Sequence, residues 1–118
     1  MEIRNAIITD VMLGREDHGI FTFYIGVNLG SCECYIGGYA LDVFDKTANT
    51  RVFRTESMEV ISKILDVVGV DKWENLPGKY IRVKAEGWGD SIGEIGNIME
   101  EKWLNFREFF SQKTVLTR

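Results

Sequence analysis

The chain has 118 residues, 45% of them hydrophobic and 27% charged, and a formal net charge of −4. These values are ordinary for a soluble globular protein and predict one domain over residues 1–118, with 111–118 as a flexible tail. The acidic balance argues against general binding to duplex nucleic acid, which needs a basic surface. Because no apolar run approaches the length of a membrane span and the N-terminus lacks the build of a secretory signal, we expect a cytoplasmic protein that does not enter a membrane.

The sequence offers little for metal or redox chemistry. Cys32 and Cys34 are one residue apart, and such a pair in one strand rarely forms a disulfide. His18 is the only histidine, so a zinc site of the usual Cys/His type cannot be assembled from this chain alone. We therefore expect neither a metal nor another cofactor.

The N-terminal third predicts three strands. Residues 3–13 are rich in β-branched side chains, and residues 20–29 alternate apolar and polar positions with a period of two. Gly30-Ser31 then fits a two-residue hairpin turn, which would pair Val27 with Cys34 and place both cysteines on the apolar face. The third strand is expected to run through 37–41, where Gly37 and Gly38 indicate a bulge or the close approach of a ligand.

The middle of the chain predicts a polar turn at 45–49, a short strand at 51–54 and the main helix. Thr55 or Ser57 would cap this helix, and Gly69 would end it in a left-handed conformation. Its apolar stripe is expected to consist of Met58, Ile61, Leu65 and Val68. A short second helix, capped by Asp71, would hold Trp73 and Leu76.

The C-terminal third predicts a strand at 79–86, a glycine-rich loop at 87–96, a strand at 95–99 and an amphipathic helix beginning near Trp103. The resulting fold class is α+β, an antiparallel sheet with one main helix, a short helix and a C-terminal helix packed on it. Four glycines surround Trp88 in the loop, an arrangement that suits a mobile segment presenting one large ring to a ligand.

No catalytic set is present, so we expect a binding protein and not an enzyme; His18 is interpreted as a solvated loop residue. Arg82 lies on one face of the strand that leads to Trp88, and a phosphate clamp beside a stacking ring suits a nucleotide pocket. A solvated, alternating strand face explains the same residues. Arg51 and Arg54 precede the N-terminus of the main helix, where anions bind, although ordinary surface arginines fit equally well.

Several segments in their order along the chain resemble small proteins encoded by bacteriophages and prophages, and in particular the phage anti-Thoeris family that sequesters cyclic ADP-ribose isomers. The segments are Leu13-Gly14-Arg15-Glu16-Asp17-His18-Gly19-Ile20-Phe21-Thr22, Gly37-Gly38-Tyr39-Ala40-Leu41-Asp42, residues 64–79, and Ile95-Gly96-Asn97 followed by Lys102-Trp103. The resemblance spans most of the chain, although Cys32-Glu33-Cys34 is not a motif of that family.

The resemblance implies a counter-defence protein that binds the cyclic nucleotide signal of the host without cleaving it, works as a homo-oligomer, and in some relatives also binds cyclic oligonucleotides. It further implies adenine stacking by Trp88 and Asn97, and phosphate contacts from Arg54, Arg82 or Arg107. Gly37 and Gly38 complete the candidate site, and Arg15 and Glu16 are candidates for a second site. The alternative is a small acidic phage protein that inhibits a host defence protein by direct contact, as anti-CRISPR proteins do.

Overall fold

The computed structural model describes residues 2–16, 18–85 and 92–116, with side chains through Ser111. Its β-strands are β1 (Glu2–Glu16), β2 (Ile20–Asn28), β3 (Glu33–Gly37), β4 (Asp42–Asp45), β5 (Thr50–Phe53), β6 (Tyr80–Ala85), β7 (Ile92–Asn97) and β8 (Trp103–Asn105). The helices are α1 (Ser57–Val68), the single 3-10 turn η1 (Trp73–Asn75) and α2 (Phe106–Leu116). The fold is α+β, as the sequence predicts.

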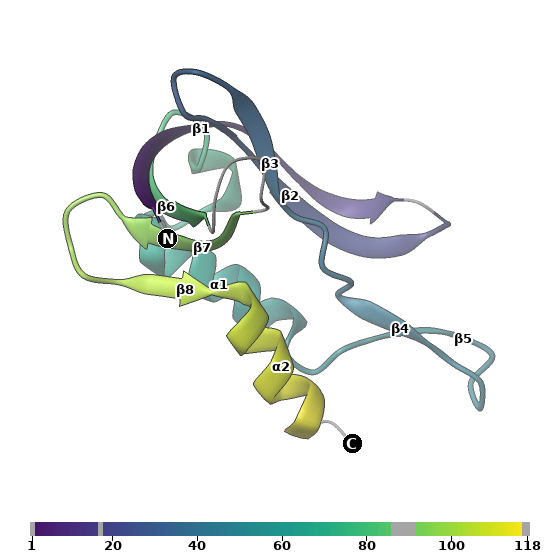
Figure 1. Ribbon diagram of the computed structural model, residues 1–118. Coiled ribbons are helices and arrows are strands. Elements are labelled where there is room, and N and C mark those ends of the chain that lie inside the picture. Colours follow the sequence, from purple (N-terminus) through teal and green to yellow (C-terminus); the bar gives the residue numbers. More distant parts are fainter. Residues whose placement is uncertain (1, 17, 86–91, 117–118) are drawn as a thin grey trace.

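Six strands form one antiparallel sheet in the order β3-β2-β1-β6-β7-β8. The long strand β1 holds the sheet together, because its first half pairs with β6 and the rest pairs with β2. Ile7 pairs with both neighbouring strands, and a register shift follows within the β1–β2 pairing, between Ile8 and Asp10. Helices α1 and α2 both pack against β7 and β8 (Figure 1).

The hydrophobic core lies between the sheet and the helices. Its fully buried side chains include Phe23 and Ile25 from β2, Ile64 from α1, Ile81 from β6 and Phe106 from α2. Alternation along β6 confirms the predicted faces, with Ile81 and Val83 buried while Tyr80 is exposed. Among the residues described, no helix is both long enough and apolar enough to span a bilayer.

The β2–β3 hairpin follows the predicted register. Val27 pairs with Cys34, Ile25 pairs with Ile36, and the N–H of Leu29 donates to the carbonyl of Cys32. The prediction that both cysteines face the core is wrong for Cys32, which is exposed next to the turn. Strand β3 also ends at Gly37 and does not continue to residue 41, because the backbone turns away there with positive φ angles at Gly37 and Gly38.

Helix α1 begins and ends near the predicted residues, and Gly69 adopts the left-handed cap with φ +92°. Neither predicted N-cap is used, because the hydroxyl of Ser57 donates to the carbonyls of Leu41 and Arg54. The predicted apolar stripe is wrong at Met58, which is 71% exposed. The buried face instead consists of Ser57, Val60, Ile61, Ile64 and Val67.

The C-terminal region departs most from the prediction. Strand β7 confirms the strand predicted from residue 95, but it begins at Ile92, within the segment expected as a glycine-rich loop, and ends at Asn97. Trp103 lies in β8 and not in the helix, because its strand pairs with Gly96 of β7. Helix α2 continues to Leu116, through much of the segment expected to be a tail. Strands β4 and β5 form a separate two-stranded sheet, an arm that projects from the body (Figure 1).

Candidate functional site

A groove of about 520 Å³ runs between α1 and β8. Lys63, Asp66 and Val67 line it from the helix, and Glu101, Lys102, Trp103 and Leu104 line it from the strand and the turn before it. Ligand pockets commonly have volumes of roughly 300–1,000 Å³. The groove therefore has the size for a small molecule, with apolar side chains between two lysines and two carboxylates.

The indole of Trp103 is fixed by contacts on several sides. A Cβ atom on Gly96, the cross-strand partner, would lie 2.5 Å from the ring, so only glycine leaves room for it. The guanidinium carbon of Arg82 lies 4.7 Å from the ring centroid and Nζ of Lys84 lies 4.2 Å from it. These distances fit cation–π interactions. The indole N–H donates to Glu101 Oε2 at 3.1 Å. Because Arg82, Gly96 and Trp103 are cross-strand partners on the sheet face opposite to the core, the ring is held on that face and does not project into the groove.

Arg82 is largely committed to the turn that connects β7 and β8. Its Nε donates to the carbonyl of Asn97 at 2.7 Å, and its Nη2 donates to the carbonyl of Glu100 at 2.8 Å. Nη2 also lies 3.1 Å from Glu101 Oε1. Arg82 thus holds this turn in place and is not among the residues that line the groove, whereas the sequence suggests it as a phosphate ligand.

Asn97 is buried and its side chain is fully engaged within the protein. Its Nδ2 donates to the carbonyl of Val67 at 2.8 Å, and its Oδ1 accepts from the N–H groups of Met99 and Glu100. A side chain with these partners positions the turn and the end of α1. Adenine stacking by Asn97, which the resemblance implies, would require these bonds to be given up.

The groove is lined by side chains of both charges. Lys63 is exposed and, within the described part of the chain, makes no ion pair; Lys102 Nζ lies 3.7 Å from Glu100 Oε2. The hydrogen bond from Trp103, and then Arg82, lowers the pKa of Glu101, so this carboxylate is charged at neutral pH. Lysines bind phosphate as point charges, and carboxylates accept hydrogen bonds from ribose hydroxyls.

The other predicted arginines lie around aromatic rings away from the groove lining. Arg54 pairs with Glu56 at 2.7 Å and lies over the ring of Phe110 at 5.7 Å. Arg107 lies close enough to Tyr39 to lower its pKa, although burial of the phenol dominates and raises that pKa overall. The Tyr39 and Phe110 rings are stacked at 4.8 Å, so Arg54 and Arg107 flank one aromatic pair.

The remaining predicted residues are not brought into the groove. Arg15 lies over Phe21 at 5.8 Å, and Glu16 is exposed at the end of β1. At Gly37 and Gly38 the protein's own groups stand where a Cβ atom would lie, the carbonyl of Phe23 at 2.5 Å and the ring of Tyr24 at 3.3 Å, respectively. Trp88 lies outside the described residues, so its role stays a prediction.

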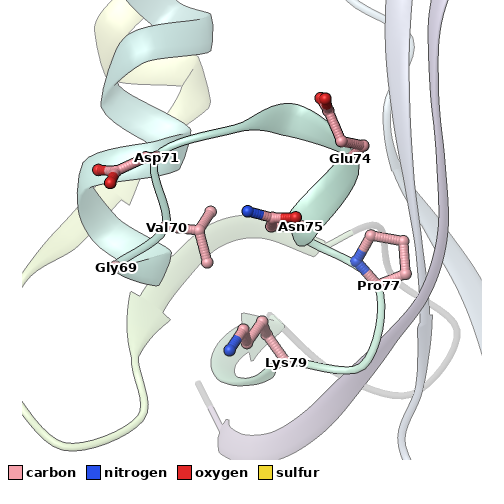
Figure 2. A pocket seen from close by; sticks show the side chains of 7 residues that line it. All are labelled: Gly69, Val70, Asp71, Glu74, Asn75, Pro77 and Lys79. Carbon is pink, nitrogen blue, oxygen red and sulfur yellow. The ribbon is translucent and has the colours of Figure 1, made fainter.

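A second hollow, of about 470 Å³, lies where the chain leaves α1. It is lined by Gly69, Val70, Asp71, Glu74, Asn75, Pro77 and Lys79. Figure 2 shows Asp71 and Glu74 on the segment that follows α1, with Lys79 across the hollow from them. Because two carboxylates and one lysine line it, this hollow suits an anionic ligand less well than the groove does.

The structure is a small α+β domain with a groove of mixed charge between α1 and β8. Comparison with protein-family models, curated proteins and solved structures found no match. Sequence reasoning missed Lys63, Asp66 and Lys102, and it assigned Trp103 to packing. The groove joins α1 to a strand almost 40 positions later, and no local spacing signals that juxtaposition.

Proposed function

We propose that this protein is a non-catalytic binding protein that takes up a cyclic ADP-ribose-type nucleotide in the groove between α1 and β8. In this proposal it sequesters the ligand as a counter-defence protein of a bacteriophage, acting in the cytoplasm of the infected cell. The observation that carries the proposal is the pair of lysines, Lys63 and Lys102, that line a groove of about 520 Å³ together with Asp66 and Glu101.

The chemistry of the groove supports a nucleotide in particular. The two lysines supply positive charge for phosphates, and Asp66 and Glu101 supply acceptors for ribose hydroxyls. Sequestration needs affinity and no reacting group, and a prearranged site provides affinity because less ordering is required on binding. The resemblance to the anti-Thoeris family points to the same ligand class.

Thermal unfolding with purified cyclic ADP-ribose isomers tests the proposal. A ligand at a hundredfold excess over its Kd stabilises the folded state by about 2.7 kcal/mol, which raises the Tm of a small domain by several degrees. We expect a shift with at least one isomer, and intact ligand after heat denaturation of the complex. Altered ligand would indicate an enzyme, and no shift with any isomer would reject the proposal in favour of direct contact with a host defence protein.

Two lysine variants locate the site. Lys63→Glu reverses a charge in the groove and should weaken binding about tenfold, which corresponds to 1.4 kcal/mol. Lys79→Glu makes the same charge change at the second hollow and should leave Kd unchanged. Equal effects of the two variants would mean that overall charge, and not the groove, controls binding.

A further inference from the structure

The arm formed by β4 and β5 exposes apolar side chains on both of its faces. Cross-strand partners share a face, so Phe44, Arg51 and Phe53 lie on one side and Val43 and Val52 lie on the other. Phe44 is 53% exposed, Phe53 is 60% exposed and Val43 is 45% exposed. The ring of Phe53 meets Phe21 of β2 edge-on, with ring centroids 5.2 Å apart, and Phe53 is still largely exposed. An isolated two-stranded hairpin is marginally stable in water, so a further strand would stabilise this sheet.

The outer edge of β5 offers free main-chain groups for another strand. The N–H of Arg54 donates to the carbonyl of Leu41, which fixes the alternation of bonded and non-bonded pairs along the hairpin. Arg51 and Phe53 therefore belong to the non-bonded pairs, and their N–H and C=O groups point away from β4. Among the residues that the structure describes, no strand pairs with this edge.

We infer that the partner of this edge is β5 of a second copy of the chain. The two copies are related by a two-fold axis that passes midway between their Val52 residues. An antiparallel pair centred there places Val52 opposite its own copy and Arg51 opposite the copy's Phe53. The outward N–H and C=O groups of Arg51 in one copy then form two hydrogen bonds with the C=O and N–H groups of Phe53 in the other copy. The strand is thus complementary to itself, as an isologous dimer interface requires.

Both faces of the resulting four-stranded sheet are chemically consistent with this register. On one face, Val43 and Val52 of each copy form a continuous apolar row. On the other face, Arg51 lies beside an aromatic ring, which suits a guanidinium. Nε of Arg51 is buried and, in the described part of the chain, has no acceptor, so the ring of Phe53 from the second copy would cover an unpartnered donor. The small contact predicts a reversible, concentration-dependent dimer.

Charge variants at Val52 test this register by sedimentation velocity. The wild-type chain should pass from a monomer of 13.5 kDa to twice that mass as its concentration rises. Val52→Lys alone and Val52→Glu alone should each be monomeric, because like charges would face each other at the axis. An equimolar mixture of the two variants should restore the dimer, and Val52→Thr should dimerise as the wild type does.

Circular dichroism of each variant checks that the fold is retained, which is expected for a change on the arm. A wild-type chain that stays monomeric up to its solubility limit would overturn the inference. So would a dimer that persists in both charge variants, because it would use another surface. Failure of the mixture to dimerise would exclude the two-fold register. None of these readouts depends on a nucleotide, so the result is separate from that for the proposed function.

Discussion

The side-chain amide of Asn97 donates a 2.8 Å hydrogen bond to the main-chain carbonyl of Val67, and this bond joins the end of β7 to the last turn of α1. The same side chain accepts from two N–H groups of the turn before β8. One buried amide thereby sets the position of the helix that lines one side of the groove relative to the turn that lines the other.

Replacing Asn97 should destabilise the protein. Asn97→Ala leaves the Val67 carbonyl and two N–H groups without their partner, and unsatisfied buried groups cost roughly 1–3 kcal/mol each. We expect a loss of about 3 kcal/mol, measured by urea unfolding. Asn97→Asp keeps the acceptor for the turn but sets a carboxylate against the Val67 carbonyl, so it should also destabilise. An unchanged urea midpoint in both variants would show that the hydrogen bonds of Asn97 do not stabilise the fold.

Gly96 and Gly93 form a matched pair within β7. A Cβ atom on Gly96 would lie 2.5–2.7 Å from the Trp103 ring, whereas one on Gly93 would meet nothing within 4 Å. Gly96→Ala should therefore displace the indole and cost about 1–3 kcal/mol, the usual range for overpacking. Gly93→Ala should be close to neutral. Tryptophan fluorescence and thermal unfolding of both variants measure the difference. Similar results for the two variants would show that the position of the ring does not depend on Gly96.

Asp42 should make the fold sensitive to acid. Its carboxylate is buried, lies 2.7 Å from Arg51 Nη2 and accepts from the N–H of Phe21. The hydrogen bond from Arg51 lowers the pKa of Asp42 in the folded state. Its contribution to stability is therefore fully present above the unfolded pKa of about 3.9 and is lost as the pH falls through the lower, folded value.

Urea unfolding across this acidic range tests the contribution of Asp42. Asp42→Asn should be less stable than the wild type at neutral pH, by about 2 kcal/mol, because a charged hydrogen bond becomes neutral. The difference between the two proteins should shrink on acidification, since the variant has no proton to bind at this position. A difference that stays constant with pH would assign the acid response to other carboxylates.

Trp88 carries the prediction made from the glycine-rich segment. If it stacks on the nucleotide base, Trp88→Ala should remove most of the ligand-induced rise in Tm and leave the Tm of the free protein unchanged. Trp88→Phe should restore part of the rise, because a smaller ring still stacks. Calorimetric titration of the three proteins measures this, and equal affinities would place the base elsewhere.

The elements that rely on local signals were predicted well. Gly30-Ser31 and the alternation of residues 20–29 define the β2–β3 register, and Gly69 marks the end of α1. The buried face of α1 was not predictable in the same way. Ser57 is buried because its hydroxyl bonds to the carbonyl of Leu41, a contact across 16 positions, and this rotates Met58 to the surface.

The candidate site was predicted only in part for a related reason. The helical spacing of Trp103, Phe106 and Phe110 suggested one helix, but Trp103 pairs with Gly96 across the sheet. Several glycines that suggested ligand approach instead make room for the protein's own groups, a ring at Gly96 and a carbonyl at Gly37. Such contacts between distant segments leave no periodic trace in the sequence.

The shared strand β1 has a consequence for the order of folding. Its pairing with β2 closes within a few residues of the connecting turn, so that hairpin and β3 can form from the first third of the chain. Its pairing with β6 joins Ile3 to Lys84 and must close a loop of about two-thirds of the chain. Because long-range pairings form slowly, the edge of β1 that faces β6 stays unpaired after the β1–β2 hairpin has formed, until β6 pairs with it.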